Sequence, residues 1–248
     1  MTSERRPTFF DGFSAFFSGF RALADQPALW PFAAVPAVIF LLLEGTFVTL
    51  SVVVVAPWVA TKLPAVASWY GEVAVGVVSY GLAVLLAIIG WFVATALAVP
   101  LSAPALERIV DQVEQKLGAP ARVPIGWLRE LACGFRSLFG ALLLAGPLLI
   151  AVWVLEAFLP VLAPITIPAH VIVTSLLVAW GLFDYPLTLR GIGFRERLAL
   201  VREHFACVLG FGLAFALLFW FPCCGILLLP VGAAAATRLT LEILPPGR

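Results

Sequence analysis

The feature that most constrains this chain is a set of long runs without a charged residue. The longest cover Val73 to Leu106 and Phe205 to Thr237, and both exceed the ~20 apolar residues that one crossing of a bilayer requires. Two further runs lie at Ser137 to Leu155 and Ala157 to Phe183. A fifth, Leu29 to Val55, is interrupted only by Glu44. The chain is therefore predicted to be an integral membrane protein.

The apolar runs are predicted to be helices and not the strands of a barrel. The chain holds 19 Pro and 20 Gly and shows no sustained alternation of apolar and polar residues, which favours helices broken by kinks and turns. Only 12% of its residues are charged and its mean hydropathy is +1.09, whereas a soluble domain has about 25% charged residues. We expect an all-α integral membrane fold.

The basic residues predict which helix ends share one side of the membrane. Of 15 Lys and Arg, only Lys62 lies between the first two expected spans, Leu29–Val55 and Val73–Val99. The others lie in the N-terminal segment, in Arg108–Arg136, in Arg190–Arg202 or at the C-terminus. If these four regions are cytoplasmic, the positive-inside rule is met almost completely. We therefore expect both termini in the cytoplasm.

This placement requires each of the last two apolar runs to enter and leave on the same face. For residues 137–183 we predict a hairpin with a turn at Pro160–Pro168 and a second arm of 15 residues. For residues 205–237 we predict a turn at Pro222–Gly225 and a second arm, Ile226–Thr237, of 12 residues. That arm spans about 18 Å, which is less than a hydrocarbon core of about 30 Å. The alternative is one long helix kinked at Pro222, which would place the C-terminus outside.

The N-terminal segment, residues 1–28, has an aromatic helical face. Phe9, Phe13, Phe16 and Phe20 recur at helical spacing, and polar side chains occupy much of the remaining circumference. This pattern is typical of an amphipathic helix at the membrane interface. A helix whose aromatic face packs on other helices fits the pattern equally well.

Four stretches of the chain form a recognisable series, in the order GFRALADQPALWPFAAVPAVIF, VPLSAPALERIVDQVEQKL, FDYPLTLRGIGFRERLALVREHFACVLGFG and PVGAAAATRL. Together they resemble one known family, the CysZ sulfate permeases of bacterial inner membranes and the wider etoposide-induced protein superfamily. The resemblance implies two long transmembrane helices, two hairpins that penetrate part of the membrane, cytoplasmic termini, assembly as dimers or higher oligomers, and inward sulfate transport.

A single membrane domain, 1–248, is expected on this basis. Its segments are an interfacial segment 1–28, two transmembrane helices within 29–106, a cytoplasmic helix 107–136 that begins near Glu107, a first hairpin 137–183, a cytoplasmic basic helix 184–204, and a second hairpin with the tail, 205–248.

The resemblance also implies where an anion would bind, and there this sequence departs from the family. Relatives use a glycine, an aliphatic residue and two arginines near the start of the first long helix, where amides and guanidinium groups suit a dianion. The matching positions here are Ala28, Leu29, Trp30 and Pro31. Pro31 lacks an amide donor, and Asp25 nearby would repel an anion. We expect the membrane architecture to be retained and the sulfate site to be lost.

Two charged residues are candidate ligand-binding positions within or beside the first span. Arg21 could supply positive charge to a solute, or could simply reach the lipid headgroups. Glu44 lies near the middle of the span, where an ionised side chain costs roughly 2.5 to 3.5 kcal/mol. It should be protonated or should face a partner or a polar cavity. A proton-linked step and a neutral carboxyl within a helix interface are both open.

Asp184 is the third candidate and belongs to an Asp-Tyr-Pro motif. Because Pro186 disfavours helix at Tyr185, we expect the motif at a helix end or start. The carboxylate would then cap a helix or pair with Arg190 or Arg195, and this structural role is favoured over ligand contact.

No pattern indicates an enzyme, a metal site or a cofactor. The two histidines and four cysteines show neither CxxC nor HExxH spacing, and Cys223 and Cys224 suit small apolar fillers at a hairpin tip. The net charge of +1 gives no basis for a nucleic-acid partner. Two functions remain, a permease or channel-like protein for a small solute such as an inorganic anion, and a non-transporting scaffold, lipid-handling or assembly protein of the same architecture.

Overall fold

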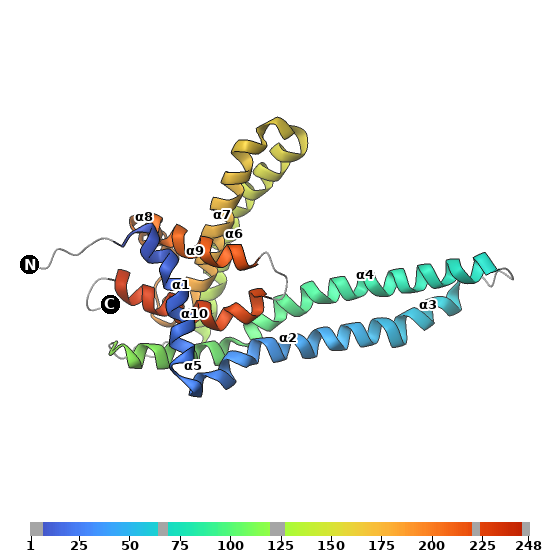
Figure 1. Ribbon diagram of the computed structural model, residues 1–248, viewed down its shortest axis with the longest axis horizontal. Helices are drawn as coiled ribbons and strands as arrows, with labels where there is room; N and C mark the ends of the chain where they lie inside the picture. The colour runs from blue at the N-terminus through green and yellow to red at the C-terminus, as the bar shows by residue number, and fades with distance from the viewer. Residues whose placement is uncertain (1–6, 64–68, 120–126, 220–223, 245–248) are drawn as a thin grey trace, which may run out of the picture. The chain divides into compact units, whose positions relative to one another are not determined.

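The computed structural model describes residues 7–63, 69–119, 127–219 and 224–244 (Figure 1). Within these ranges every regular element is a helix and none is a strand, so the predicted all-α class is confirmed. The chain is a multi-pass membrane protein, because at least four of its helices are long and apolar enough to cross a bilayer. These are Pro27–Lys62, Trp69–Leu101, Ala163–Leu189 and Cys224–Ile243. Two compact units are present, residues 34–104 and the remainder.

The unit of residues 34–104 is a helical hairpin (Figure 1). One arm is α2 (Trp30–Leu50), continued by a π-helical turn at Ser51–Val55 and by α3 (Ala56–Lys62), and the other is α4 (Trp69–Leu101). Both helices expected in this region are confirmed and extend beyond the predicted spans. Backbone groups in lipid must be satisfied within the segment, and unbroken helices achieve this.

The two arms of this hairpin contact each other through aromatic rings and a glycine. The ring of Phe47 packs so closely over Gly90 that a Cβ there would lie only 2.6 Å from the Phe47 Cβ. The rings of Phe40 and Trp91 meet edge to face, with centroids 4.7 Å apart. Most of the other large side chains of α2 and α4 are exposed, which is the surface expected of helices that face lipid.

The other unit is built around α10 (Cys224–Ile243). Thirteen of its 20 residues are buried, and it packs against α1 (Phe9–Ala24) and α7 (Ala163–Leu189). α9 (Phe205–Phe219) packs against the same two helices. The remaining helices of this unit are η1 (Pro27–Leu29), α5 (Ala103–Lys116), α6 (Trp127–Phe158), η3 (Pro160–Leu162) and α8 (Phe194–Glu203).

Glycines allow the backbones of α1 and α9 to approach closely. A Cβ on Gly12 would overlap the carbonyl of Cys207, and a Cβ on Gly210 would overlap the carbonyl of Phe9. Small residues at such crossings are how membrane helices gain contact area without a hydrophobic driving force between them.

The first hairpin turns earlier than predicted. α6 ends at Phe158, a single 3-10 turn covers Pro160–Leu162, and α7 begins at Ala163. The second arm therefore has 27 residues and the predicted arm of 15 is wrong. Pro164 lies in the first turn of α7, where its missing N–H has no helical partner to lose, and Pro168 costs one internal hydrogen bond.

The second hairpin is present, but its arms also differ from the prediction. α9 and α10 run in opposite directions (Figure 1) and both pack on α1, so they are not halves of one kinked helix. The predicted arm of 12 residues is wrong, because α10 continues to Ile243 with Arg238 exposed beside a buried Leu239. Pro222 and Cys223 lie outside the described residues, and Cys224 begins α10.

The N-terminal helix packs into the core of its unit. Gly12, Phe16, Gly19 and Leu23 are buried on one side of α1, and the Phe16 ring meets Phe215 of α9 with centroids 4.9 Å apart. Of the two alternatives for this segment, packing on other helices is therefore observed. Other phenylalanines of α1 remain exposed.

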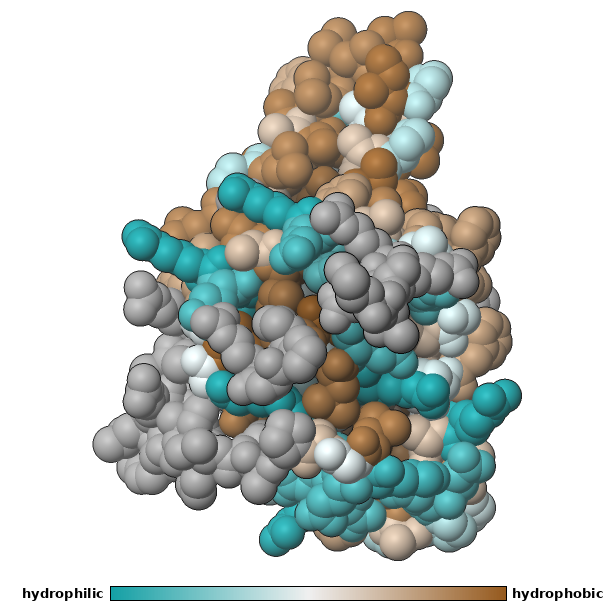
Figure 2. All heavy atoms as spheres, turned by 90° about the vertical axis from the view of Figure 1, so that its left-hand side faces the viewer, coloured by the Kyte–Doolittle hydropathy of each residue, from teal (hydrophilic) through white to brown (hydrophobic). Residues whose placement is uncertain are grey.

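One face of this unit carries many hydrophilic side chains (Figure 2). That face carries α8, the start of α1 and the ends of α5 and α10, whereas the projecting α6–α7 hairpin is predominantly hydrophobic. α5 begins at Ala103, four residues before the expected start near Glu107. α8 and α9 meet at a bend of 96°.

Candidate functional site

The backbone at the start of the first long helix has already used the amides that an anion would need. After α1 the chain forms the 3-10 turn Pro27–Leu29, and α2 begins at Trp30. The Leu29 amide donates to the carbonyl of Gln26 at 2.9 Å, and the Trp30 amide donates back into the turn. Pro31 has no N–H. These groups cannot bind an anion without opening the turn.

The side chains at residues 28–30 are uncharged. One is buried in the core and the other two lie at the surface. Leu29 is fully buried in the hydrophobic core of its unit. The Trp30 ring is 60% exposed, and its Nε1 donates to the carbonyl of Leu23 at 3.1 Å. Ala28 is exposed. The indole therefore holds the end of α1 through a hydrogen bond, and it carries no positive charge that could attract an anion as a guanidinium group does.

Two polar side chains lie beside this position. The Asp25 carboxylate is 3.8 Å from the Lys116 ammonium of α5, and both are about half exposed. The Nε2 of Gln26 is buried and has no hydrogen-bond partner among the residues that the structure describes. One neutral amide attracts a dianion far less than two guanidinium groups do. These contacts give a physical reason to expect no sulfate site here, and the loss of that site remains a prediction.

Arg21 lies instead in a groove between α1 and α10. The groove has a volume of about 560 Å³ and carries charges of both signs. Arg238 lies one helical turn before Glu242, with Nε 3.5 Å from a carboxylate oxygen. The residues of the groove used below are Asp11, Ser14, Ser18, Arg21, Arg238 and Glu242.

Glu44 lies in the other unit, on the same face of α2 as Phe40 and Phe47. Both phenylalanines contact α4, at Trp91 and Gly90 respectively. One carboxyl oxygen of Glu44 is buried and has no hydrogen-bond partner among the described residues. A buried polar atom without a partner is costly, so this oxygen marks Glu44 as a position to test.

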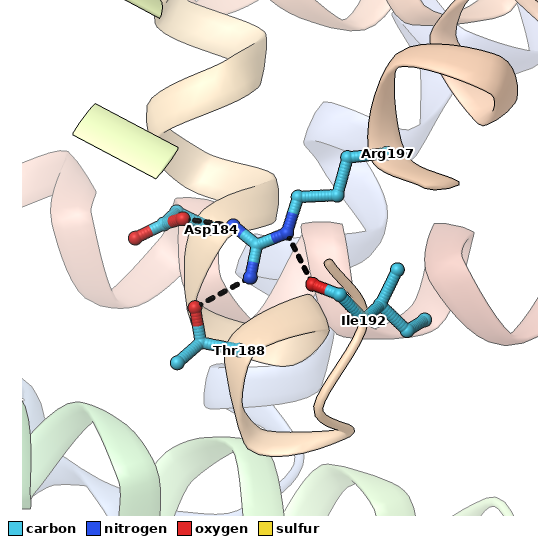
Figure 3. Close-up of polar contacts among 4 residues, drawn as sticks. All are labelled: Asp184, Thr188, Ile192 and Arg197. Carbon is cyan, nitrogen blue, oxygen red and sulfur yellow. Dashed lines mark hydrogen bonds and ion pairs between the residues drawn. The ribbon is translucent and has the colours of Figure 1, made fainter. Parts of the chain in front are cut away.

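Asp184 lies inside α7 and not at a helix end, so the prediction of a helix boundary at the Asp-Tyr-Pro motif is wrong. Pro186 also lies inside α7, three residues before the helix ends at Leu189. The Asp184 carboxylate forms an ion pair with Arg197 of α8 (Figure 3). The predicted partners were Arg190 and Arg195, so this part of the prediction is wrong.

Arg197 connects the end of α7 to the start of α8 through several polar contacts (Figure 3). Its side chain is 2% exposed. Besides Asp184, it donates from Nη2 to the Thr188 hydroxyl at 2.7 Å and from Nε to the carbonyl of Ile192 at 2.8 Å. The guanidinium therefore ties the last turns of α7 to the start of α8, which is a structural role.

A second buried ion pair joins α5 to the end of α7. Arg190 Nε lies 3.1 Å from a Glu114 carboxylate oxygen, and the two side chains are 6% and 7% exposed. Burial raises the pKa of the Glu114 carboxyl above its usual value of 4.5, and the positive charge of Arg190 opposes part of this rise.

Glu114 and the central role of Arg197 were not foreseen from the sequence. A weak signal existed for Arg197, because it lies three residues after Phe194 and four before Val201, on the apolar side of α8. Nothing in the sequence separates Glu114 from the other acids of α5. Among the described residues, no group of three or more His, Cys, Asp and Glu side chains could hold a metal ion.

One protein family matches most of this chain. The family is described as Sulfate transporter CysZ/Etoposide-induced protein 2.4, and the match covers residues 15–230. The chain belongs to this family. The matched residues run from α1 into α10 and include elements of both units, as the resemblance in the sequence indicated. No protein of established function matches the chain significantly.

Each candidate position has its own surroundings in this CysZ/Etoposide-induced protein 2.4 family member. Arg21 lies with Arg238 in the α1–α10 groove, and Asp184 is held by Arg197. Glu44 belongs to the other unit. At the four positions that the resemblance assigns to sulfate, the Leu29 and Trp30 amides donate within the turn, Pro31 has no amide, and no side chain is charged.

Proposed function

We propose that the protein is a permease or channel-like protein for a small solute in the inner membrane, with sulfate or another inorganic anion as the first candidate. The observation that carries this proposal is the family match over residues 15–230. Helices long and apolar enough to cross a membrane support it. Assembly as a dimer or higher oligomer and cytoplasmic termini belong to the same proposal.

A second candidate is a non-transporting membrane protein that shares the architecture. It is favoured by one specific observation, the use of the Leu29 and Trp30 amides within the turn before α2. An anion at that position would find no arginine at residues 28–31, and the Leu29 and Trp30 amides already donate within the turn. Transport by this chain therefore requires a route that does not depend on residues 28–31.

Reconstitution into liposomes tests transport directly. Wild-type protein and empty liposomes are compared for uptake of labelled sulfate and of a panel of other inorganic anions. Uptake of at least one anion above the empty-liposome background is expected. If no anion is taken up while the protein is folded and inserted, transport is excluded for these solutes and the non-transporting alternative stands.

A triple variant tests the position at the helix start. Ala28→Gly, Trp30→Arg and Pro31→Arg together supply an amide donor and two guanidinium groups, as the resemblance implies for relatives. We expect this variant to gain sulfate uptake relative to wild type. A wild type that already carries sulfate, with no gain in the variant, would contradict the loss of the sulfate site.

A variant at Glu44 is tested in the same uptake assay. If its carboxyl takes part in a proton-linked step, Glu44→Gln lowers uptake and removes its dependence on a pH gradient. An unchanged rate would assign Glu44 to packing between α2 and α4.

A further inference from the structure

The surface of α1 is divided into three faces. Gly12, Phe16, Gly19 and Leu23 point into the protein. A second face exposes Phe10, Phe17 and Phe20, which are 78%, 62% and 44% exposed. The third face is polar and lines the groove with α10 through Asp11, Ser14, Ser18 and Arg21.

The exposed aromatic face adjoins the groove directly, because Phe17 belongs to both. Large exposed aromatic side chains next to a polar strip are typical of a helix at the boundary between acyl chains and headgroups. This arrangement suits a lipid whose headgroup lies in the groove and whose acyl chains run along Phe10 and Phe17.

The charges of the groove determine which headgroup fits. Arg21 and Arg238 each carry a positive charge, and Asp11 and Glu242 each carry a negative one. Guanidinium groups recognise phosphate by charge-assisted hydrogen bonds. One Asp11 oxygen already accepts from the amide and the hydroxyl of Thr8 at 2.7 Å, which leaves Glu242 as the main carboxylate for a bound cation. Since the formal charges of the four side chains cancel, the groove suits a ligand with one phosphate and one cation better than a ligand with net negative charge.

The hydroxyl groups add acceptors for such a cation. Ser14 donates its hydroxyl hydrogen to the carbonyl of Asp11 at 2.9 Å, and Ser18 donates to the carbonyl of Ala15 at 2.6 Å. Their oxygens remain available as acceptors. An ammonium group with three N–H donors can use them together with the carboxylates, whereas a quaternary amine cannot.

Arg21 is available for a phosphate. Within the described part of the chain no carboxylate lies within ion-pair distance of its guanidinium group, and the side chain is exposed. Arg238 is held only by Glu242 at 3.5 Å, with both side chains about half exposed, and such exposed pairs contribute little.

We propose that the groove between α1 and α10 binds the headgroup of an amine-bearing zwitterionic phospholipid such as phosphatidylethanolamine. The phosphate lies on Arg21 and Arg238, and the ammonium faces Asp11, Glu242 and the serine oxygens. The exposed phenylalanines of α1 contact the acyl chains. This site is independent of any transport activity.

Lipid binding to the full-length protein in detergent tests the proposal. Native mass spectrometry compares phosphatidylethanolamine, phosphatidylcholine and phosphatidylglycerol with the same acyl chains, and soluble phosphoethanolamine without chains. Phosphatidylethanolamine is expected to bind most tightly. Equal binding of the three lipids would overturn the assignment of the headgroup. Phosphoethanolamine binding as tight as the lipid would assign the groove to a soluble ligand and overturn the lipid part.

Two variants separate this groove from general lipid adhesion. Arg21→Gln is expected to weaken phosphatidylethanolamine binding about tenfold or more, since one charge-assisted hydrogen bond is lost. Glu242→Gln is expected to remove the preference for phosphatidylethanolamine over phosphatidylcholine. Arg202→Gln is the matched control, because Arg202 is an exposed arginine of α8 and is expected to change nothing. Wild-type affinity in Arg21→Gln would overturn the proposal.

Discussion

At the residue scale, the corner between α7 and α8 depends on one buried arginine. Arg197 is almost fully buried and contacts Asp184, Thr188 and Ile192. A guanidinium group is costly to bury unless each of its donors is satisfied. The sequence could predict that Asp184 pairs with an arginine of this region, but not which one, because the choice depends on how α8 turns back along α7.

Replacing Arg197 with methionine should destabilise the protein by about 2 to 3 kcal/mol. Removing one partner of a buried pair costs about 3 to 5 kcal/mol, and the cost is smaller here because Asp184 is 31% exposed. The free energy of unfolding is measured in mixed detergent micelles. Arg195→Met is the control, because Arg195 is exposed and its loss should change stability by less than about 0.5 kcal/mol. Equal effects of the two variants would contradict the assigned role.

The buried pair of Glu114 and Arg190 should make stability depend on pH. Burial raises the pKa of Glu114 above 4.5 in the folded protein, so the folded state holds this proton more tightly than the unfolded state. The contribution of Glu114 is therefore full below pH 4.5 and is lost as the pH rises through the raised pKa.

Glu114→Gln isolates this dependence. The free energy of unfolding of the wild type minus that of the variant should fall as the pH increases from about 4.5, and should then level off. A difference that rises with pH over this range would mean that Arg190 outweighs burial and lowers the pKa.

At the element scale, the lengths of the hairpin arms were the least predictable feature. The apolar runs of the sequence identify which segments are helices, and the helices of both hairpins are present. Pro168 and Cys224 were assigned to turns but lie within α7 and α10. Proline is a weak stop signal in membrane helices, because neighbouring helices can compensate for the lost hydrogen bond.

The crossing of α1 and α9 should tolerate no side chain at Gly210. Alanine there would place a Cβ against the carbonyl of Phe9, and overpacking of this kind costs about 1 to 3 kcal/mol. Gly181→Ala is the matched control, because nothing lies within 4 Å of a Cβ at that position of α7. Its stability should rise by up to about 1 kcal/mol, since alanine favours helix. The contrast is read from unfolding in mixed micelles, and an equal loss in both variants would argue against a close crossing.

At the scale of the whole molecule, charge and family membership lead to the same proposed topology. The sequence predicted four basic regions on one side, and the face of the unit built around α10 that Figure 2 shows carries many hydrophilic side chains below a predominantly hydrophobic α6–α7 hairpin. The length argument for a shallow second hairpin does not hold, since α10 has 20 residues. Its burial by α1 and α7 supports the hairpin instead, because α10 is sheltered by protein and not by lipid.

The side of the membrane on which the C-terminus lies tests this proposal most directly. A reporter that distinguishes cytoplasm from periplasm is fused after Arg248, and control fusions are placed in residues 64–68 and 120–126. The account predicts a cytoplasmic C-terminus, a cytoplasmic signal at 120–126 and a periplasmic signal at 64–68. A periplasmic C-terminus, with both controls as expected, would contradict the return of the second hairpin to the face that it left.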